Sequence, residues 1–374
     1  MDPFRSYPVL VSLLSPFRKS QQKTMALVLA ALVSAGHARS FLIAMKMQLW
    51  LGIQLQSALN RLYRLLHNIR VADELLTVGL LEMLARSPDR HLVVAVDWTE
   101  WPHDLRMLVG AVVAGRRALP VLCHGYPKRV PIRSQNKREN LFAQMLAWAA
   151  RQAKVHLTLL CDRGFRRTSW LRHLDRLGLF FVVRLMDDVF VELEPGLRRP
   201  LGQVALPLGR VLDLGVVPLR SDAAHRVRVI GYWAPGAREP WWLATNRTDP
   251  AAHILKLYDR RMTVEQQFRD SKGSRFGVKL AWTQFRRPDV LGRIAIFVGV
   301  ALLIWTLVGR LAAQRDPNLR LICRRKGPRL SYVTIGLGMI AFAPTLPPIT
   351  HALLAQFLEP PAFRPVAGRS VGGK

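Results

Sequence analysis

The sequence predicts a multi-domain protein of the α/β (α+β) class, and three observations support this prediction. Half of the 374 residues are hydrophobic, which is enough apolar material for a large buried core. Apolar residues recur at helical spacing before about residue 90 and form short strand-like runs directly afterwards. Pro and Gly then punctuate residues 186–250, and helical spacing resumes at about residue 251. We therefore expect a helical region, a mixed region with a β-rich insertion, and a second helical region.

Residues 1–90 are expected to form a helical, DNA-binding domain. Their apolar residues at helical spacing include Leu42, Met45, Leu49, Leu55, Leu59, Leu62 and Leu66. Over the whole chain, Lys and Arg outnumber Asp and Glu by 55 to 25, a formal net charge of +30, which favours a polyanionic partner. Most of these cations are arginines, whose guanidinium binds phosphate through two donors at once. A nucleic acid, DNA or RNA, is thus the expected partner, ahead of an anionic membrane; a helical bundle that merely packs is the alternative for this region.

Residues 91–185 predict strands and helices in a definite order. The expected elements are strands at 91–98, 105–113 and 118–126, a helix at 136–152, a strand at 155–162, a helix at 168–177 and a strand at 179–185. Three strands, helix, strand, helix, strand is the order of a ribonuclease H-like core, a mixed sheet flanked by helices. We expect residues 251–315 to complete this core, residues 186–250 to form a largely antiparallel insertion, and residues 316–374 to form a C-terminal region with a flexible tail.

Two apolar segments and the cysteines bear on the cellular compartment. Residues 294–309 form an uncharged run of 16 residues, shorter than the roughly 20 that a membrane-spanning helix needs, so we expect a buried core helix and no membrane association. Residues 23–38 resemble a signal peptide, but 22 residues precede them and a helical pattern follows. Cys123, Cys161 and Cys323 have no paired or metal-binding spacing, which is typical of the reducing cytoplasm.

A charged segment, YDRRMTVEQQFRDSK (258–272), predicts a helix with one functional face. At about 100° per residue, Tyr258, Arg261, Glu265 and Lys272 fall within an arc of about 60°. Glu265 is the only acid on this face. Because Tyr258 and Lys272 are about 21 Å apart along the axis, the face would lie along several nucleotides, with the carboxylate near its middle; an ordinary solvated helix is the alternative.

Two further acids follow apolar runs. We expect Asp97 to end the first strand of the core and Asp162 to end the fourth, and these strands are neighbours in a ribonuclease H-like sheet. Together with Glu265 they would offer the oxygen ligands that Mg²⁺ or Mn²⁺ prefers. The sequence therefore predicts a metal site built from Asp97, Asp162 and Glu265.

These motifs resemble the DDE transposases of bacterial insertion sequences, specifically the IS-four type with its Tyr-x2-Arg-x3-Glu-x6-Lys signature. The segment at 258–272 matches all four positions, DRGF (162–165) is similar to the second-Asp motif and DWT (97–99) to the first, and the resemblance spans about residues 90–315. It implies that Asp97, Asp162 and Glu265 bind two divalent ions per site, while Tyr258, Arg261 and Lys272 contact the transposon end. It also implies a tryptophan against a flipped base, for which Trp241 fits the spacing better than Trp242. Arg163 could contact phosphate or simply be solvated.

The resemblance implies a DNA transposase of the bacterial cytoplasm, associated with the nucleoid. Such an enzyme binds the terminal inverted repeats of its insertion sequence, cleaves the ends by two-metal-ion hydrolysis and joins them to target DNA, in a cut-and-paste reaction through hairpin ends. A homodimer is expected in the complex with paired ends. The alternatives are a transposase-derived DNA-binding protein that no longer cuts, a nuclease without strand transfer, and a basic membrane-associated protein.

Overall fold

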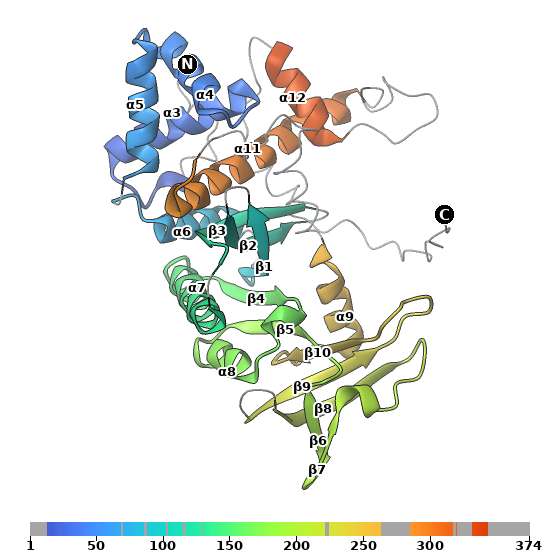
Figure 1. Cartoon of the computed structure of the whole chain (residues 1–374). Coiled ribbons are helices and arrows are strands. Elements are labelled where there is room, and N and C mark those ends of the chain that lie inside the picture. Colours follow the sequence, from blue (N-terminus) through green and yellow to red (C-terminus); the bar gives the residue numbers. More distant parts are fainter. Residues whose placement is uncertain are drawn as a thin grey trace.

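The centre of the protein is a mixed β-sheet with helices on both sides (Figure 1). In the computed structural model, the described residues are 13–68, 70–85, 88–101, 104–114, 117–129, 131–220, 224–262, 285–316, 319 and 331–342. The helices among them are α3 (Lys19–Ala35), α4 (Ser40–Leu51), α5 (Leu55–Leu66), α6 (Asp73–Leu84), α7 (Ile132–Gln152), η1 (Arg163–Phe165), α8 (Thr168–Arg176), η2 (Leu201–Gln203), α9 (Ala251–Asp259), α11 (Pro288–Arg315) and α12 (Tyr332–Phe342).

The strands follow the order that the sequence predicted for the core. They are β1 (His91–Trp101), β2 (Leu105–Ala114), β3 (Arg117–Pro127), β4 (His156–Cys161), β5 (Phe180–Leu185), β6 (Phe190–Glu194), β7 (Leu197–Pro200), β8 (Val211–Arg220), β9 (Ala224–Tyr232) and β10 (Trp241–Thr245). β1, β2 and β3 form an antiparallel meander, and β1 and β4 and then β4 and β5 pair in parallel. The strands of this part are rich in Val, Leu and Ala, as expected for strands covered on both faces.

The strands of the expected insertion extend the same sheet. The full order is β3-β2-β1-β4-β5-β10-β9-β8-β6-β7, and every pairing beyond β5 is antiparallel. The segment at 186–250 is thus largely antiparallel, as expected, with one isolated parallel bridge between Leu208 and Trp233. Its last strand, β10, adds directly to the edge of the core at β5. The pairing of β10 with β5 places the chain that leads into α9 beside the core strands.

The apolar run at 294–309 lies inside α11, a helix of 28 residues. Its most apolar 18-residue window has a mean hydropathy of 2.3, and that window is entirely buried, which agrees with the core helix expected from the sequence. By length and composition α11 is also long enough to cross a membrane; α3 and α4 reach that length only as a pair, which is bent by 111°. Figure 1 shows α11 between the N-terminal helices and the β1–β3 part of the sheet. A Cβ at Gly292 would collide with the carbonyl oxygen of Cys123, so this glycine permits the close approach of α11 to β3.

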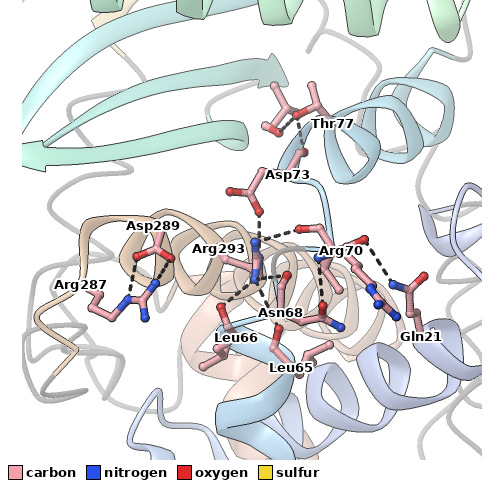
Figure 2. Close-up of polar contacts among 12 residues, drawn as sticks. Gln21, Leu65, Leu66, Asn68, Arg70, Asp73, Thr77, Arg287, Asp289 and Arg293 are labelled. Carbon is pink, nitrogen blue, oxygen red and sulfur yellow. Dashed lines mark hydrogen bonds and ion pairs between the residues drawn. The ribbon is translucent and has the colours of Figure 1, made fainter.

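A buried arginine joins α11 to the N-terminal helices (Figure 2). Arg293 Nε donates to the carboxylate of Asp73 at 2.8 Å, with side chains only 8% and 14% exposed. Its two Nη atoms donate to the carbonyl oxygens of Leu65, Leu66, Asn68 and Val71. The last carbonyls of a helix have no partner within it. Arg293 therefore caps the C-terminal end of α5 and also holds the first residue of α6.

The N-terminal helices bury most of their apolar residues but not all. Met25 to Val33 of α3 are buried, which places the segment that resembles a signal peptide within the core. On α4, by contrast, Met45 and Leu49 are exposed. Cys123 and Cys161 are buried thiols whose pKa burial raises, and Cys323 lies outside the described residues.

Candidate active site

Two carboxylates meet where β1 and β4 stop pairing. The last residues paired in the parallel ladder are Val96 and Cys161, so Asp97 and Asp162 follow at the same edge of the sheet. Asp162 follows β4, as predicted, and caps η1 by accepting a hydrogen bond from the backbone nitrogen of Gly164 at 2.8 Å. The prediction that Asp97 ends its strand is wrong. β1 continues to Trp101, because it still pairs with β2 on the side away from β4.

The Asp97 side chain lies in a setting that disfavours negative charge. Burial raises its pKa to about 6, and repulsion from the Asp162 carboxylate adds to this. The guanidinium of Arg261 opposes the rise; its Nη1 donates to Asp97 Oδ2 at 3.2 Å, with side chains 11% and 17% exposed. Within the described part of the chain, no group of three or more His, Cys, Asp or Glu side chains could hold a metal ion. The site thus contains two neighbouring carboxylates, and the guanidinium of Arg261 partly balances their negative charge.

Tyr258 and Arg261 reach this pair from the end of α9. The Tyr258 side chain is buried, which raises its pKa to about 12, and both Arg261 and Asp162 are close enough to affect that pKa. The prediction of one continuous helix from residue 258 is wrong at its start: α9 ends at Asp259, and a turn follows in which the Arg261 nitrogen donates to the Tyr258 carbonyl. This turn brings the Arg261 guanidinium to Asp97. Glu265 and Lys272 lie outside the described residues.

The two neighbouring tryptophans of β10 occupy different environments. Trp242 is 1% exposed, and a Cβ at Gly231 would collide with its ring, so it is a core residue. Trp241 is half-buried, and its ring packs edge-on against Tyr258 with 5.2 Å between centroids. Because successive residues of a strand face opposite sides of a sheet, only Trp241 lies on the side of Tyr258.

A buried glutamate that the sequence reasoning missed supports both acid-bearing segments. Glu139 of α7 is 1% exposed. It accepts hydrogen bonds from Trp98 Nε1 at 2.9 Å, from Arg167 Nη2 at 2.9 Å and from Gln135 Nε2 at 3.0 Å. Trp98 follows Asp97, and Arg167 lies in the segment that follows Asp162. The available signal was helical spacing: Glu139 shares the apolar face of α7 with Phe142.

Arg163, which follows Asp162, is paired with a carboxylate and is not simply solvated. Its Nη1 lies 3.2 and 3.3 Å from the two carboxylate oxygens of Glu239, in the segment between β9 and β10. Arg184 of β5 donates to the same carboxylate at 2.8 Å. Two arginines on either side of one glutamate thus lie beside the candidate site.

Comparison with known families bears on this arrangement. No curated protein matches the chain significantly. The chain does match the family of the transposase DDE domain over residues 88–291, more than half of its length. The match includes both described carboxylates, the arginine beside them and the position of Glu265. This protein therefore belongs to the family of transposases with a DDE domain.

Proposed function

We propose that this protein moves an insertion sequence by cut and paste: it binds the terminal inverted repeats, cleaves the ends and joins them to target DNA. Its family makes it a transposase, an enzyme that acts on DNA. The observation that carries the finer proposal is the meeting of Asp97 and Asp162 at one edge of the sheet, beside Arg261. Carboxylates held together in a low-dielectric setting serve metal-dependent phosphodiester chemistry better than they serve stability.

The residues at this edge fit a divalent cation. Asp97 and Asp162 offer hard oxygen ligands, and the repulsion that helps to raise the pKa of Asp97 to about 6 is of the kind that a bound cation relieves. We propose Glu265, outside the described residues, as the third ligand. Two Mg²⁺ or Mn²⁺ ions held by these three residues would activate the attacking water and stabilise the leaving oxygen.

The other residues of the site are proposed to position the DNA end. The pKa of Tyr258, about 12, keeps its hydroxyl protonated at neutral pH, so it can donate a hydrogen bond to a phosphate oxygen. Arg261, which balances Asp97 in the protein without DNA, would supply a second, charged donor, and Lys272 a third. Trp241, whose ring packs against Tyr258, is the candidate to stack on a flipped base during hairpin formation.

The N-terminal helices provide a surface suited to the phosphates of the repeat. A groove with a cavity of about 520 Å³ runs between α3 and α5 and contains Arg61 and Arg64. Neither arginine makes a hydrogen bond or an ion pair in the described part of the chain. The sequence has no acid between Asp2 and Asp73, so no carboxylate of α3, α4 or α5 repels DNA. We propose that this groove binds the repeat, as part of an N-terminal DNA-binding domain at residues 1–90.

Assembly and location follow from the same reaction. We propose a homodimer in the complex with paired ends, in which each subunit binds one end and cuts the other. The net charge of +30 supports this arrangement, because two ends and a target bring a high density of phosphate together. The proposed location is the cytoplasm of a bacterial cell, on the nucleoid.

Cleavage of end DNA tests the site. Asp97→Asn and Glu265→Gln should each abolish Mg²⁺-dependent nicking of a duplex taken from the DNA flanking the gene, yet leave binding of that duplex in EDTA largely intact. Asp188→Asn is the matched control, because this aspartate is 62% exposed and its only ion pair is a 3.7 Å contact with Arg166, within the described residues. Unaltered cutting by either site variant would reject the assignment. Joining of the cut end to a target plasmid separates a transposase from a nuclease.

A further inference from the structure

The three-residue cluster of Arg163, Glu239 and Arg184 holds one carboxylate between two guanidinium groups. Arg163 Nη1 lies 3.2 and 3.3 Å from the Glu239 oxygens, and Arg184 Nη2 lies 2.8 Å from Oε1. Arg184 also donates to the carbonyl oxygen of Pro240 at 3.2 Å, which keeps its guanidinium directed at the same point. Two guanidiniums that converge on one anionic group form the arrangement that binds phosphate.

Each member of the cluster lies close to a residue of the candidate site. Arg163 follows Asp162, and Glu239 precedes Trp241 by two residues. Arg184 is close enough to Tyr258 to affect the pKa of its hydroxyl. A DNA strand that passes the carboxylates and reaches Trp241 would therefore bring its phosphates to these two arginines.

The carboxylate is also easy to displace. The side chains of Arg163 and Glu239 are 51% and 49% exposed, and such exposed ion pairs contribute little to stability. Arg184 is less exposed, at 19%, so its position depends less on Glu239 than that of Arg163 does. A phosphate that replaces the carboxylate would keep both charge-assisted bonds and would release counterions from the DNA.

We propose that Glu239 occupies, in the protein without DNA, the place that a phosphate of the DNA strand takes in the complex. Arg163 and Arg184 are then a phosphate clamp beside the active site, and Glu239 restrains it until DNA arrives. Because Glu239 lies on the chain that leads into β10, its release also frees the segment before Trp241. This inference rests on the proposed function, since it assumes that the DNA end passes Asp162.

Binding of a short fluorescein-labelled duplex, measured by anisotropy in EDTA over a series of salt concentrations, tests the clamp in the full-length protein. Glu239→Gln should bind about 1.5- to 5-fold more tightly for each ion pair released, the range expected for exposed pairs. Arg163→Gln and Arg184→Gln should each bind less tightly and lower the magnitude of the salt slope by about 0.9. The affinity of either arginine variant should therefore respond about 3.5-fold less than that of the wild type to a fourfold change in salt.

The matched control is Glu192→Gln. Glu192 also pairs with an arginine, Arg198 at 3.0 Å, but in the β6–β7 hairpin at the far end of the sheet. The Glu192→Gln substitution removes the same charge as Glu239→Gln, so it measures the gain in DNA affinity that comes only from a more positive protein. Glu239→Gln should exceed it, and that excess should vanish when Arg163 and Arg184 are both replaced by glutamine. The excess is a difference between folded, DNA-binding proteins, which circular dichroism verifies for each variant.

The outcomes of these experiments distinguish the clamp from the proposed function. Equal gains from the two glutamate variants, or an excess that survives loss of both arginines, would overturn the clamp while leaving the proposed function intact. A wild-type protein that binds DNA, shows the clamp effects and never nicks its end DNA would sink the proposed function alone. A wild-type protein that does not bind the duplex would overturn both.

Discussion

Replacing Arg293 by methionine should destabilise the protein severely. The substitution keeps most of the aliphatic volume but removes a cation that is 8% exposed and makes one ion pair and four hydrogen bonds to carbonyl oxygens. Breaking a buried ion pair by removing one partner costs about 3–5 kcal/mol, since the other charge stays buried. A domain has only about 5–15 kcal/mol of stability in total. We therefore expect Arg293→Met to lose a large part of the free energy of unfolding.

Two comparisons separate the ion pair from the carbonyl contacts. Asp73→Asn should cost only about 1 kcal/mol, because the asparagine oxygen can still accept from Arg293 and the arginine keeps its four carbonyl partners. Arg287→Met is the matched control, because Arg287 lies at the start of the same helix, α11. It pairs with Asp289 at the surface, with side chains 60% and 50% exposed, so its loss should leave the free energy of unfolding unchanged within error. Figure 2 shows both pairs.

Urea unfolding followed by tryptophan fluorescence measures these differences. Burial raises the pKa of Asp73 even with Arg293 present, so its ionised form costs stability, and that cost appears as the pH rises through the folded-state pKa. Without Arg293 this pKa should rise further. The penalty of Arg293→Met should therefore be larger at neutral pH than in mildly acidic buffer. A penalty as small as that of Arg287→Met, or one that grows on acidification, would refute the reasoning.

Three further predictions concern binding, packing and pH. Arg61→Gln and Arg64→Gln should weaken binding of end DNA and lower the salt slope by about 0.9 for each phosphate that is no longer bound; an unchanged slope in anisotropy titrations would argue against the groove. Glu139→Gln should cost about 1–3 kcal/mol in urea unfolding, because both carboxylate oxygens accept hydrogen bonds and the new amide nitrogen would face a donor in place of one of them; a cost near zero would contradict that role. Burial, and after it the charge of Arg247, lowers the pKa of His91 below 6.5. The stability that neutral His91 contributes is therefore present above pH 6.5 and is lost as the pH falls through the folded-state pKa. In thermal unfolding, His91→Gln should reduce the loss of stability on acidification.

The sequence indicated much of the core because local patterns carry that information. The apolar runs that predicted strands at 91–98 and 155–162 lie in β1 and β4, and the uncharged run at 294–309 lies within the buried helix α11. Strand ends were harder to place. β1 continues past Asp97 because β2 pairs with its other edge, and that pairing depends on the turn between two strands and not on the residues of β1 alone.

Long-range contacts could not be predicted in this way. Arg261 meets Asp97 across 164 positions of the chain, and Glu139 joins Trp98 to Arg167 from a third element. No local sequence pattern predicts either contact, because side chains from separate elements meet only after the sheet has its register and the helices have packed on it. The pairing of one glutamate with Arg163 and Arg184 also needs three separate elements: η1, β5 and the segment between β9 and β10.

The amino-acid sequence by itself predicted which acids could bind a metal ion and that the partner would be a polyanion, because residue identity, spacing and net charge are properties of the chain. Only the tertiary structure decided that β1 continues past Asp97 and that the guanidinium of Arg261 already balances this carboxylate. The reason is that strand register and helix packing are set by the sum of many weak contacts over the whole core, and no short segment contains that sum.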